Sequence, residues 1–286
     1  MADEKRTDQP ANIEKVDVNP DYLAQYIAED KSLESLKKHR VVPRFKIVQP
    51  TTAAELQQKF GIGTAIVQPG EAMVVKFDAE PKYFDFVPLF FFKEWAKWRD
   101  LKGAGPMILD RSHDPVSELA KLSADKDARR ELYPGHEAMP EADRMYNSYV
   151  EHIRFIGMIY GDHPLTGLPV TLSFERGEWG QGNNFLTAVS LRRQVVNGES
   201  IEVPLWAQVW RLNTVFHNPG QSKKWYGFDF EAAEQGIILP DEAPTMRAMH
   251  LDFADLFSKS RLMVDDAPET EKPEKADGSV KGHDEF

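Results

Sequence analysis

Residues 194–215, QVVNGESIEVPLWAQVWRLNTV, decide the fold class that this sequence predicts. Asn197-Gly198 is the strongest short hairpin signal in the chain, because both central residues of a type I′ turn need a positive φ. The stretch 201–215 then alternates between two sets of side chains, which is typical of a long strand. One set, predicted to face the core, is Val203, Leu205, Ala207 and Val209, and the opposite set is Trp206, Gln208 and Trp210.

Further strands are predicted on both sides of this stretch. They cover residues 149–160, 170–175, 185–193 and 224–230. The glycine-rich run 177–184 is interpreted as a hairpin loop that exposes Trp179, since it contains no Lys and lies between two predicted strands. Four strands within about 80 residues, joined by Gly- and Asn-rich turns, predict a small antiparallel barrel or sandwich.

The N-terminal half mixes helices with strands. Helices are predicted at 19–40, 53–60 and 93–101, and strands at 44–48, 72–77 and 83–92. Residues 102–148 are rich in Gly and Pro and form an excursion within one domain or an inserted subdomain, with a charged helix near 117–132. A final helix with an apolar stripe is predicted at 243–262. The fold class is therefore mainly β with peripheral helices (α+β).

Composition and charge limit the possible functions. The chain has 286 residues, a formal net charge of −11 and no Cys, which excludes disulfides, Cys-ligated zinc, iron–sulfur clusters and a thiol nucleophile. Residues 265–286 hold eight acidic and three basic residues and almost no apolar ones. We therefore expect disordered ends at 1–18 and 265–286 around a single domain at 19–264. We expect no signal peptide and no membrane span, and a cytoplasmic protein.

Signatures of catalysis are absent from the sequence. It has no phosphate-binding P-loop, no Gly-x-Ser-x-Gly elbow and no His-Glu-x-x-His motif. Asp110, His113 and Asp114 could in principle serve a metal-dependent nuclease, but a polar turn before Pro115 explains them more simply. We therefore predict a protein that is not an enzyme and that uses no cofactor and no metal.

Aromatic and basic residues gather in the β region. Four of the six Trp residues lie between 179 and 225, and the segment 170–226 has six basic and four acidic residues inside an acidic protein. A positive groove with stacking rings is what single-stranded nucleic acid requires. The alternative is that the rings fill the core and the basic residues form a solvated rim.

The acidic C-terminus ends in Asp284-Glu285-Phe286. Its acidic groups can compete with phosphates for a basic groove or dock on a partner, with the terminal Phe in an apolar pocket. The alternative is a solubilising tail with an accidental Phe.

In these features the chain resembles a bacteriophage-type single-stranded DNA-binding protein. The resemblance is carried by PVTLSFERGEWGQGNNFLTAVSLRR, PLWAQVWRL, KKWYGFDF and the final HDEF. It implies an OB-fold-like antiparallel barrel that binds single-stranded DNA in replication or recombination, with replication proteins recruited by Asp284, Glu285 and Phe286. It also implies stacking by Trp206, Trp210, Trp225 and Tyr226, and phosphate contacts by Arg192, Arg193, Arg211, Lys223 and Lys224. The exposed Trp179 is a further predicted DNA-binding residue. The alternative is a virion structural or assembly protein whose Trp206 and Trp210 pack against another chain, and a homo-oligomer is possible.

Overall fold

The computed structural model describes residues 40–80, 82–101, 105–218 and 224–264. The predicted disordered ends, almost all of the helix at 19–40, and the residues Lys223, Asp284, Glu285 and Phe286 lie outside these residues. The described residues from Val41 onward belong to one compact unit.

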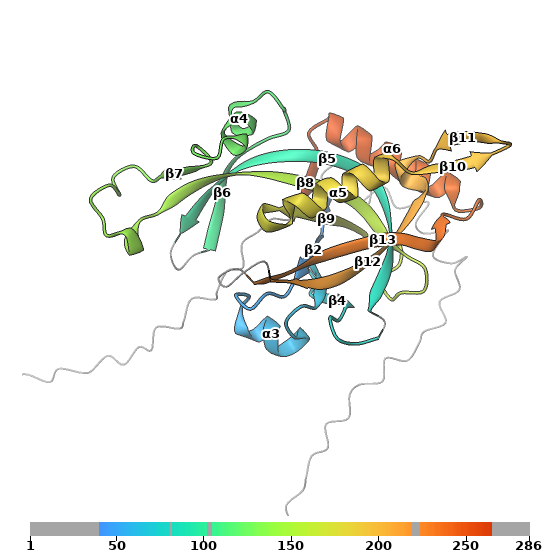
Figure 1. Cartoon of the computed structure of the whole chain (residues 1–286), viewed down its shortest axis with the longest axis horizontal. Coiled ribbons are helices and arrows are strands. Elements are labelled where there is room, and N and C mark those ends of the chain that lie inside the picture. Colours follow the sequence, from blue (N-terminus) through green and yellow to red (C-terminus); the bar gives the residue numbers. More distant parts are fainter. Residues whose placement is uncertain (1–39, 81, 102–104, 219–223, 265–286) are drawn as a thin grey trace, which may run out of the picture. The chain divides into compact units, whose positions relative to one another are not determined.

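A ten-stranded sheet forms the framework of this unit (Figure 1). Its strand order is β13-β12-β5-β8-β9-β2-β3-β4, with β6 added to β5 and β7 added to β8. The bounds are β2 (Arg44–Ile47), β3 (Ala65–Gln68), β4 (Ala72–Val75), β5 (Tyr83–Leu101), β6 (Gly105–Ser112), β7 (Arg130–Leu132), β8 (Tyr146–Tyr160), β9 (Pro169–Glu175), β12 (Gln208–His217) and β13 (Trp225–Ile237).

Smaller elements surround this sheet. Two separate two-stranded sheets pair β1 (Arg40–Val42) with β14 (Leu262–Val264), and β10 (Arg193–Val196) with β11 (Glu199–Glu202). The helices are α3 (Ala54–Phe60), α4 (Glu118–Ala124), α5 (Trp179–Ser190) and α6 (Ala243–Ser258), with short 3₁₀ turns η1 (Glu141–Asp143), η2 (Arg176–Glu178) and η3 (Leu205–Ala207).

The predicted class, mainly β with peripheral helices, is confirmed by these elements. The sheet is curled and open, and its ends are not joined by a strand ladder. An OB-fold is a five-stranded, partly open barrel. The OB-fold therefore stays a prediction.

Strand β5 overturns the predicted helix at 93–101. Trp95 and Trp98 are three residues apart, which suits one face of a helix, but β5 continues through both residues. Its ladder with β8 runs from Asp85 opposite Tyr160 to Arg99 opposite Asn147. Long-range pairing with β8 therefore overrides the local spacing. Together with β6, β7 and α4, these strands form a projecting arm that contains the described residues 105–148 of the predicted excursion (Figure 1).

Helix α5 overturns the hairpin loop predicted at 177–184 and the strand predicted at 185–193. Phe185 and Val189 are four residues apart, so both fall on the buried face of this helix. The Phe185 ring lies 4.8 Å from the rings of Phe155 and Phe230. Gly182 allows the close approach, because a Cβ there would lie 2.6 Å from the Phe174 Cβ. Burial of Phe185 among the aromatic side chains of the sheet therefore stabilises the helix at this position.

The two faces of the sheet bury two cores. One contains Phe45, Phe84, Phe155, Phe185 and Trp210, and the other contains Leu89, Ile156, Val209, Met246 and Phe253. Helix α5 packs on the first and α6 on the second, so the predicted C-terminal helix is confirmed with a slightly earlier end. The strand predicted at 201–215 is interrupted after Glu202 by η3, and β12 begins at Gln208.

Candidate nucleic-acid interface

A cavity of about 740 Å³ opens where three segments meet. These segments are β2, the end of β9 together with η2, and the start of β13. Strand β2 turns Phe45 and Ile47 into the core, and this alternation leaves Arg44 and Lys46 on its other, half-exposed face. The polar and aromatic lining comprises Arg44, Phe45, Lys46, Gln49, Ser173, Glu175, Arg176, Glu178, Lys224, Trp225, Tyr226 and Phe228.

Two neighbouring aromatic residues of β13 line the cavity. Trp225 pairs across the ladder with His217, and their rings stack at 5.2 Å between centres and 22° between planes. The buried Nε1 of Trp225 has no hydrogen-bond partner among the residues described. A buried donor of this kind is costly unless an acceptor reaches it, so it marks a place where a ligand or water can bind.

The edge of β13 is held in place by one amide side chain. Gln49 Nε2 donates to the Tyr226 carbonyl oxygen at 2.6 Å, and the Tyr226 N–H donates to Gln49 Oε1 at 2.9 Å. Gln49 therefore satisfies both backbone groups as a neighbouring strand would. Because Gln49 follows β2, this pair of bonds links the start of β13 to the end of β2 beside the cavity.

Cations outnumber anions in the cavity wall. Arg44, Lys46, Arg176 and Lys224 line it together with two carboxylates. Burial, followed by the nearby charge of Arg44, lowers the pKa of Lys46 to about 8. A bound anion would favour the charged form of Lys46.

The two carboxylates have opposite pKa shifts. Burial alone would raise the pKa of Glu175, but His152, Arg176 and Arg154 lower it to about 2. Burial, and then the charge of Glu175, raise the pKa of Glu178 to about 8. Glu178 is therefore protonated at neutral pH, which leaves four cations facing one ionised carboxylate in the cavity wall.

Arg176 has an unusual backbone conformation. Its backbone φ is 50°, which lies in the left-handed region that residues other than Gly rarely adopt. A long cationic side chain at such a position costs stability, and residues in this conformation cluster at functional sites. The strained backbone therefore makes Arg176 a candidate functional residue of the cavity wall.

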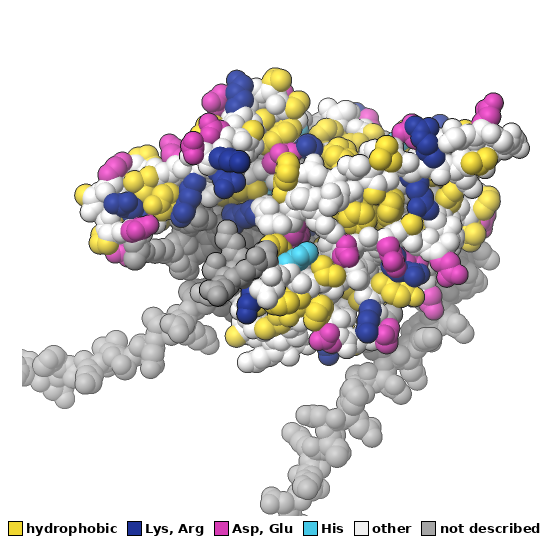
Figure 2. Space-filling view, viewed as in Figure 1, with side chains coloured by type: hydrophobic (Ala, Val, Ile, Leu, Met, Phe, Trp, Pro, Cys, Tyr) yellow, Lys and Arg dark blue, Asp and Glu magenta, His cyan; other side chains and the backbone are white. Residues whose placement is uncertain are grey.

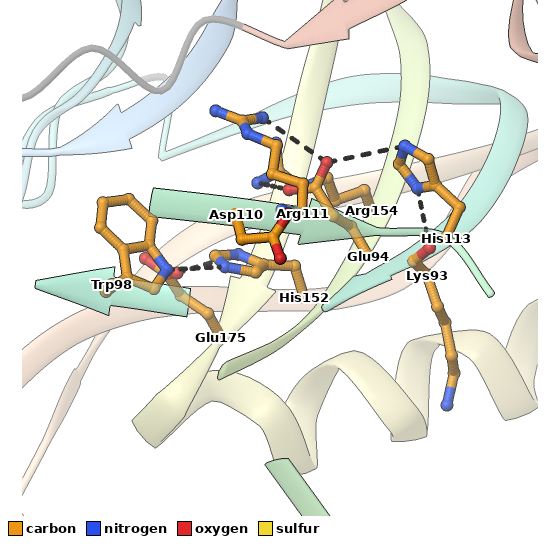
Figure 3. Close-up of polar contacts among 9 residues, drawn as sticks. All are labelled: Lys93, Glu94, Trp98, Asp110, Arg111, His113, His152, Arg154 and Glu175. Atoms are coloured by element: carbon orange, nitrogen blue, oxygen red, sulfur yellow. Dashed lines mark hydrogen bonds and ion pairs between the residues drawn. The ribbon is translucent and has the colours of Figure 1, made fainter. Parts of the chain in front are cut away.

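A buried polar network runs from the cavity wall into the root of the arm (Figure 3). Glu175 Oε2 lies 2.9 Å from His152 Nδ1, and the indole N–H of Trp98 donates to His152 Nε2 at 3.3 Å. His152 and Trp98 are buried, so this chain of contacts ties the end of β9 to β8 and β5.

The second part of the network is a buried ion pair. Arg154 Nη2 donates to Glu94 Oε1 at 2.9 Å, and the exposed fractions of these side chains are 0% and 3%. Arg111 and His113 approach the other oxygen of Glu94 at 3.5 and 3.8 Å. Sequence reasoning missed this network. The signal was present as His152 and Arg154, two residues apart on one face of β8 where the strand becomes mainly apolar.

The metal candidates do not converge. Asp110 Oδ1 accepts from the Arg111 N–H, Asp114 Oδ1 accepts from the Val116 N–H, and His113 turns towards Glu94. In the portions of the chain that the structure covers, no three His, Asp or Glu side chains are placed to hold a metal ion. Asp110 lies within β6, opposite Lys97, and only His113 and Asp114 lie after the strand, before the turn at Pro115.

The burial of Trp210 corrects one predicted stacking residue. Trp210 is 5% exposed, its indole N–H donates to Gln208 Oε1 at 3.0 Å, and its ring contacts Phe185 and Phe230. Successive residues do alternate within β12, but both faces of the sheet are covered, so Trp210 lies in the first core and Val209 in the second. Trp206 lies in η3, half-buried against the second core. Trp179 is exposed at the start of α5 but does not line the cavity.

The predicted phosphate contacts are scattered. The Arg192 guanidinium lies 5.4 Å from the Trp210 ring centre, Arg193 lies in β10, and Arg211 pairs with Asp85 at 3.4 Å. Of the predicted residues, Lys224, Trp225 and Tyr226 line the cavity. Arg44, Lys46 and Arg176 join them, and only the alternation of RFKIV pointed to the first two. Over the arm, Lys and Arg side chains alternate with Asp and Glu side chains and form no patch of one sign (Figure 2).

These features define a mainly-β protein with a curled, open sheet and a basic, aromatic cavity at one edge of it. The chain belongs to the Pam3 phage gp34-like protein family, whose sequence model matches residues 14–259. No curated protein and no solved structure matches the chain. No helix among the residues described is long and apolar enough to cross a membrane.

Proposed function

We propose that this phage protein binds single-stranded DNA, with the cavity between β2, η2 and β13 as its binding site. The observation that carries the proposal is the lining itself, in which four cations surround Trp225 with its unpartnered indole N–H. Cations that track phosphates and rings that contact bases are the two components of sequence-tolerant single-strand binding. We propose further that the curled end of the sheet serves as an OB-type platform, and that the acidic tail recruits replication proteins in the host cytoplasm.

The residues of the cavity wall have different roles in the proposed binding, according to their chemistry. Arg44, Lys46 and Arg176 neutralise phosphate oxygens, and the half-buried ring of Trp225 in the cavity wall contacts a base. Protonated Glu178 adds no negative charge at neutral pH. Affinity is then mainly electrostatic and falls with added salt.

Replacing Arg176 by glycine should weaken DNA binding without lowering the stability of the fold. Glycine adopts a φ of 50° without strain, so the free energy of unfolding should change by less than about 1 kcal/mol. The dissociation constant for labelled oligo-dA should rise about tenfold, because one phosphate contact is lost. The slope of log K against log salt should become shallower by about 0.7. Fluorescence anisotropy across salt concentrations measures both quantities.

The matched control for this variant is Lys259→Gln. Lys259 is exposed, pairs with Asp255 at the end of α6 and does not line the cavity. Losing its charge should leave the salt slope unchanged. An Arg176→Gly protein that binds with wild-type affinity and slope would refute the proposed site.

Affinity for oligo-dA should fall by roughly an order of magnitude from about pH 7 to pH 9. Lys46 and Glu178 both have a pKa of about 8. Lys46 loses its positive charge over this range, and Glu178 gains a negative one beside Glu175 and near His217, so both changes oppose anion binding. Glu178→Gln should bind more tightly than wild type at pH 9 and equally at pH 7. A flat pH profile of the wild type contradicts this account.

One observation favours the second candidate, a virion assembly protein. The β10–β11 hairpin exposes apolar side chains that nothing in the described part of the chain covers. A titration of tryptophan fluorescence with oligo-dT separates the two functions. A change that saturates supports DNA binding, whereas no change in a stable oligomer supports assembly.

A further inference from the structure

The β10–β11 hairpin is a two-stranded ribbon with no third strand among the residues described. All eight residues of its strands are exposed, and it forms a sheet of its own beyond the end of α5 (Figure 1). An isolated two-stranded ribbon is marginally stable in water. Its turn is the predicted one, with φ of 53° at Asn197 and 84° at Gly198.

The ribbon surface has the chemistry of a protein contact. Val195 is 70% exposed, and Val196 and Ile201 are 40% and 44% exposed. Two arginines at the base, Arg192 and Arg193, are balanced by the two acidic residues of β11, so the ribbon has no excess positive charge for phosphate. Acidic, basic and apolar side chains are all visible on it in Figure 2. Exposed apolar side chains of this kind mark protein–protein contacts.

Hydrogen-bonded and non-hydrogen-bonded residue pairs alternate along the ribbon, and this alternation shows which backbone groups of β10 could pair with another strand. With a two-residue turn, Val196 and Glu199 form the first hydrogen-bonded pair, and Gln194 and Ile201 form the next. The backbone N–H and C=O groups of Arg193 and Val195 therefore point away from β11, along the open edge of β10. An open edge of this kind is a template for another strand.

The charges distinguish the two edges. Strand β11 has Glu199 and Glu202 at its two ends, so two copies of it cannot overlap without bringing their carboxylates close together. Strand β10 has a single charge, at its base. When two β10 strands pair antiparallel about Val195, each Val195 faces its counterpart and the arginines lie at opposite ends. The hairpin tips then point in opposite directions, so the two protein bodies lie on opposite sides.

We propose that β10 of this chain pairs antiparallel with β10 of a second copy about a two-fold axis at Val195, which makes a four-stranded sheet from two ribbons. The contact is isologous and closes after two copies. Its area is small, so we expect a dimer with a micromolar dissociation constant. The contact involves no residue of the cavity, so it stands or falls separately from DNA binding.

The test is sedimentation of the full chain between about 1 and 200 µM. Wild type should shift from monomer to dimer, and Val195→Lys should weaken the dimer by at least about tenfold, since like charges then meet on the two-fold axis. Ser200→Lys is the matched control, because Ser200 lies opposite Val195 on the same face but away from the pairing edge. It should dimerise nearly as wild type.

Hydrogen exchange of the wild type tests the same geometry without a variant. The amides of Arg193 and Val195 should become protected as concentration rises, whereas those of Ser200 and Glu202 should not. A wild type that is monomeric over the whole range overturns the proposal. The proposal is also overturned if Val195→Lys leaves the dimer dissociation constant unchanged, or if Ser200→Lys weakens the dimer as much as Val195→Lys does.

Discussion

Replacing Glu94 by glutamine is expected to lower the free energy of unfolding by about 3–5 kcal/mol. Glu94 and Arg154 are buried and joined at 2.9 Å, and Arg111 approaches the same carboxylate. A neutral amide removes the carboxylate that lies 2.9 Å from the buried Arg154 guanidinium, so this charge loses its hydrogen-bonded counter-charge. Urea unfolding followed by far-ultraviolet circular dichroism measures the loss.

The control is Glu151→Gln on the neighbouring strand of the same arm. Glu151 pairs with Lys93 at 2.6 Å, but both side chains reach solvent. Removing that pair should cost about 0–1 kcal/mol. Changing both Glu94 and Arg154 to methionine should recover much of the loss, because both members of the buried pair are then apolar. If Glu94→Gln costs no more than Glu151→Gln, the buried pair is not an organising element of the arm.

The second large effect is expected from Phe185→Ala, at about 3–5 kcal/mol. Phe185 is fully buried and contacts the rings of Phe155, Phe174, Trp210 and Phe230. Its removal leaves a cavity in the concave face of the sheet that rigid aromatic neighbours cannot fill. The same urea unfolding measures this loss.

Leu191→Ala, just beyond the end of α5, provides the comparison. Leu191 is 67% exposed, so its truncation should change stability by less than about 0.5 kcal/mol. Equal losses in the two variants would show that α5 is not anchored through Phe185.

Several local features followed from sequence patterns. The alternation of RFKIV predicted β2, the apolar stripe predicted α6, and Asn197-Gly198 predicted the β10–β11 turn. Each depends on neighbours within a few residues, so periodicity and turn chemistry suffice to predict it.

The cavity could be predicted only in part. Lys224, Trp225 and Tyr226 were singled out from their composition. Arg44 and Lys46 come from a strand about 180 residues earlier, and Arg176 lies between the strand predicted at 170–175 and the loop predicted at 177–184. No local pattern encodes which distant strand comes to lie beside β13. Trp210 failed as a stacking residue for the same reason, since Phe185 and Phe230 cover it.

The sequence by itself determined the mainly-β class, the absence of thiol chemistry and the position of the tight hairpin, because composition and short-range backbone preferences are local properties. The tertiary structure alone decided that 93–101 is a strand, that 179–190 is a helix and which cations meet around Trp225. The physical reason is that burial and strand pairing depend on partners far away along the chain, and their free energies exceed the small local propensities that favoured the other conformations.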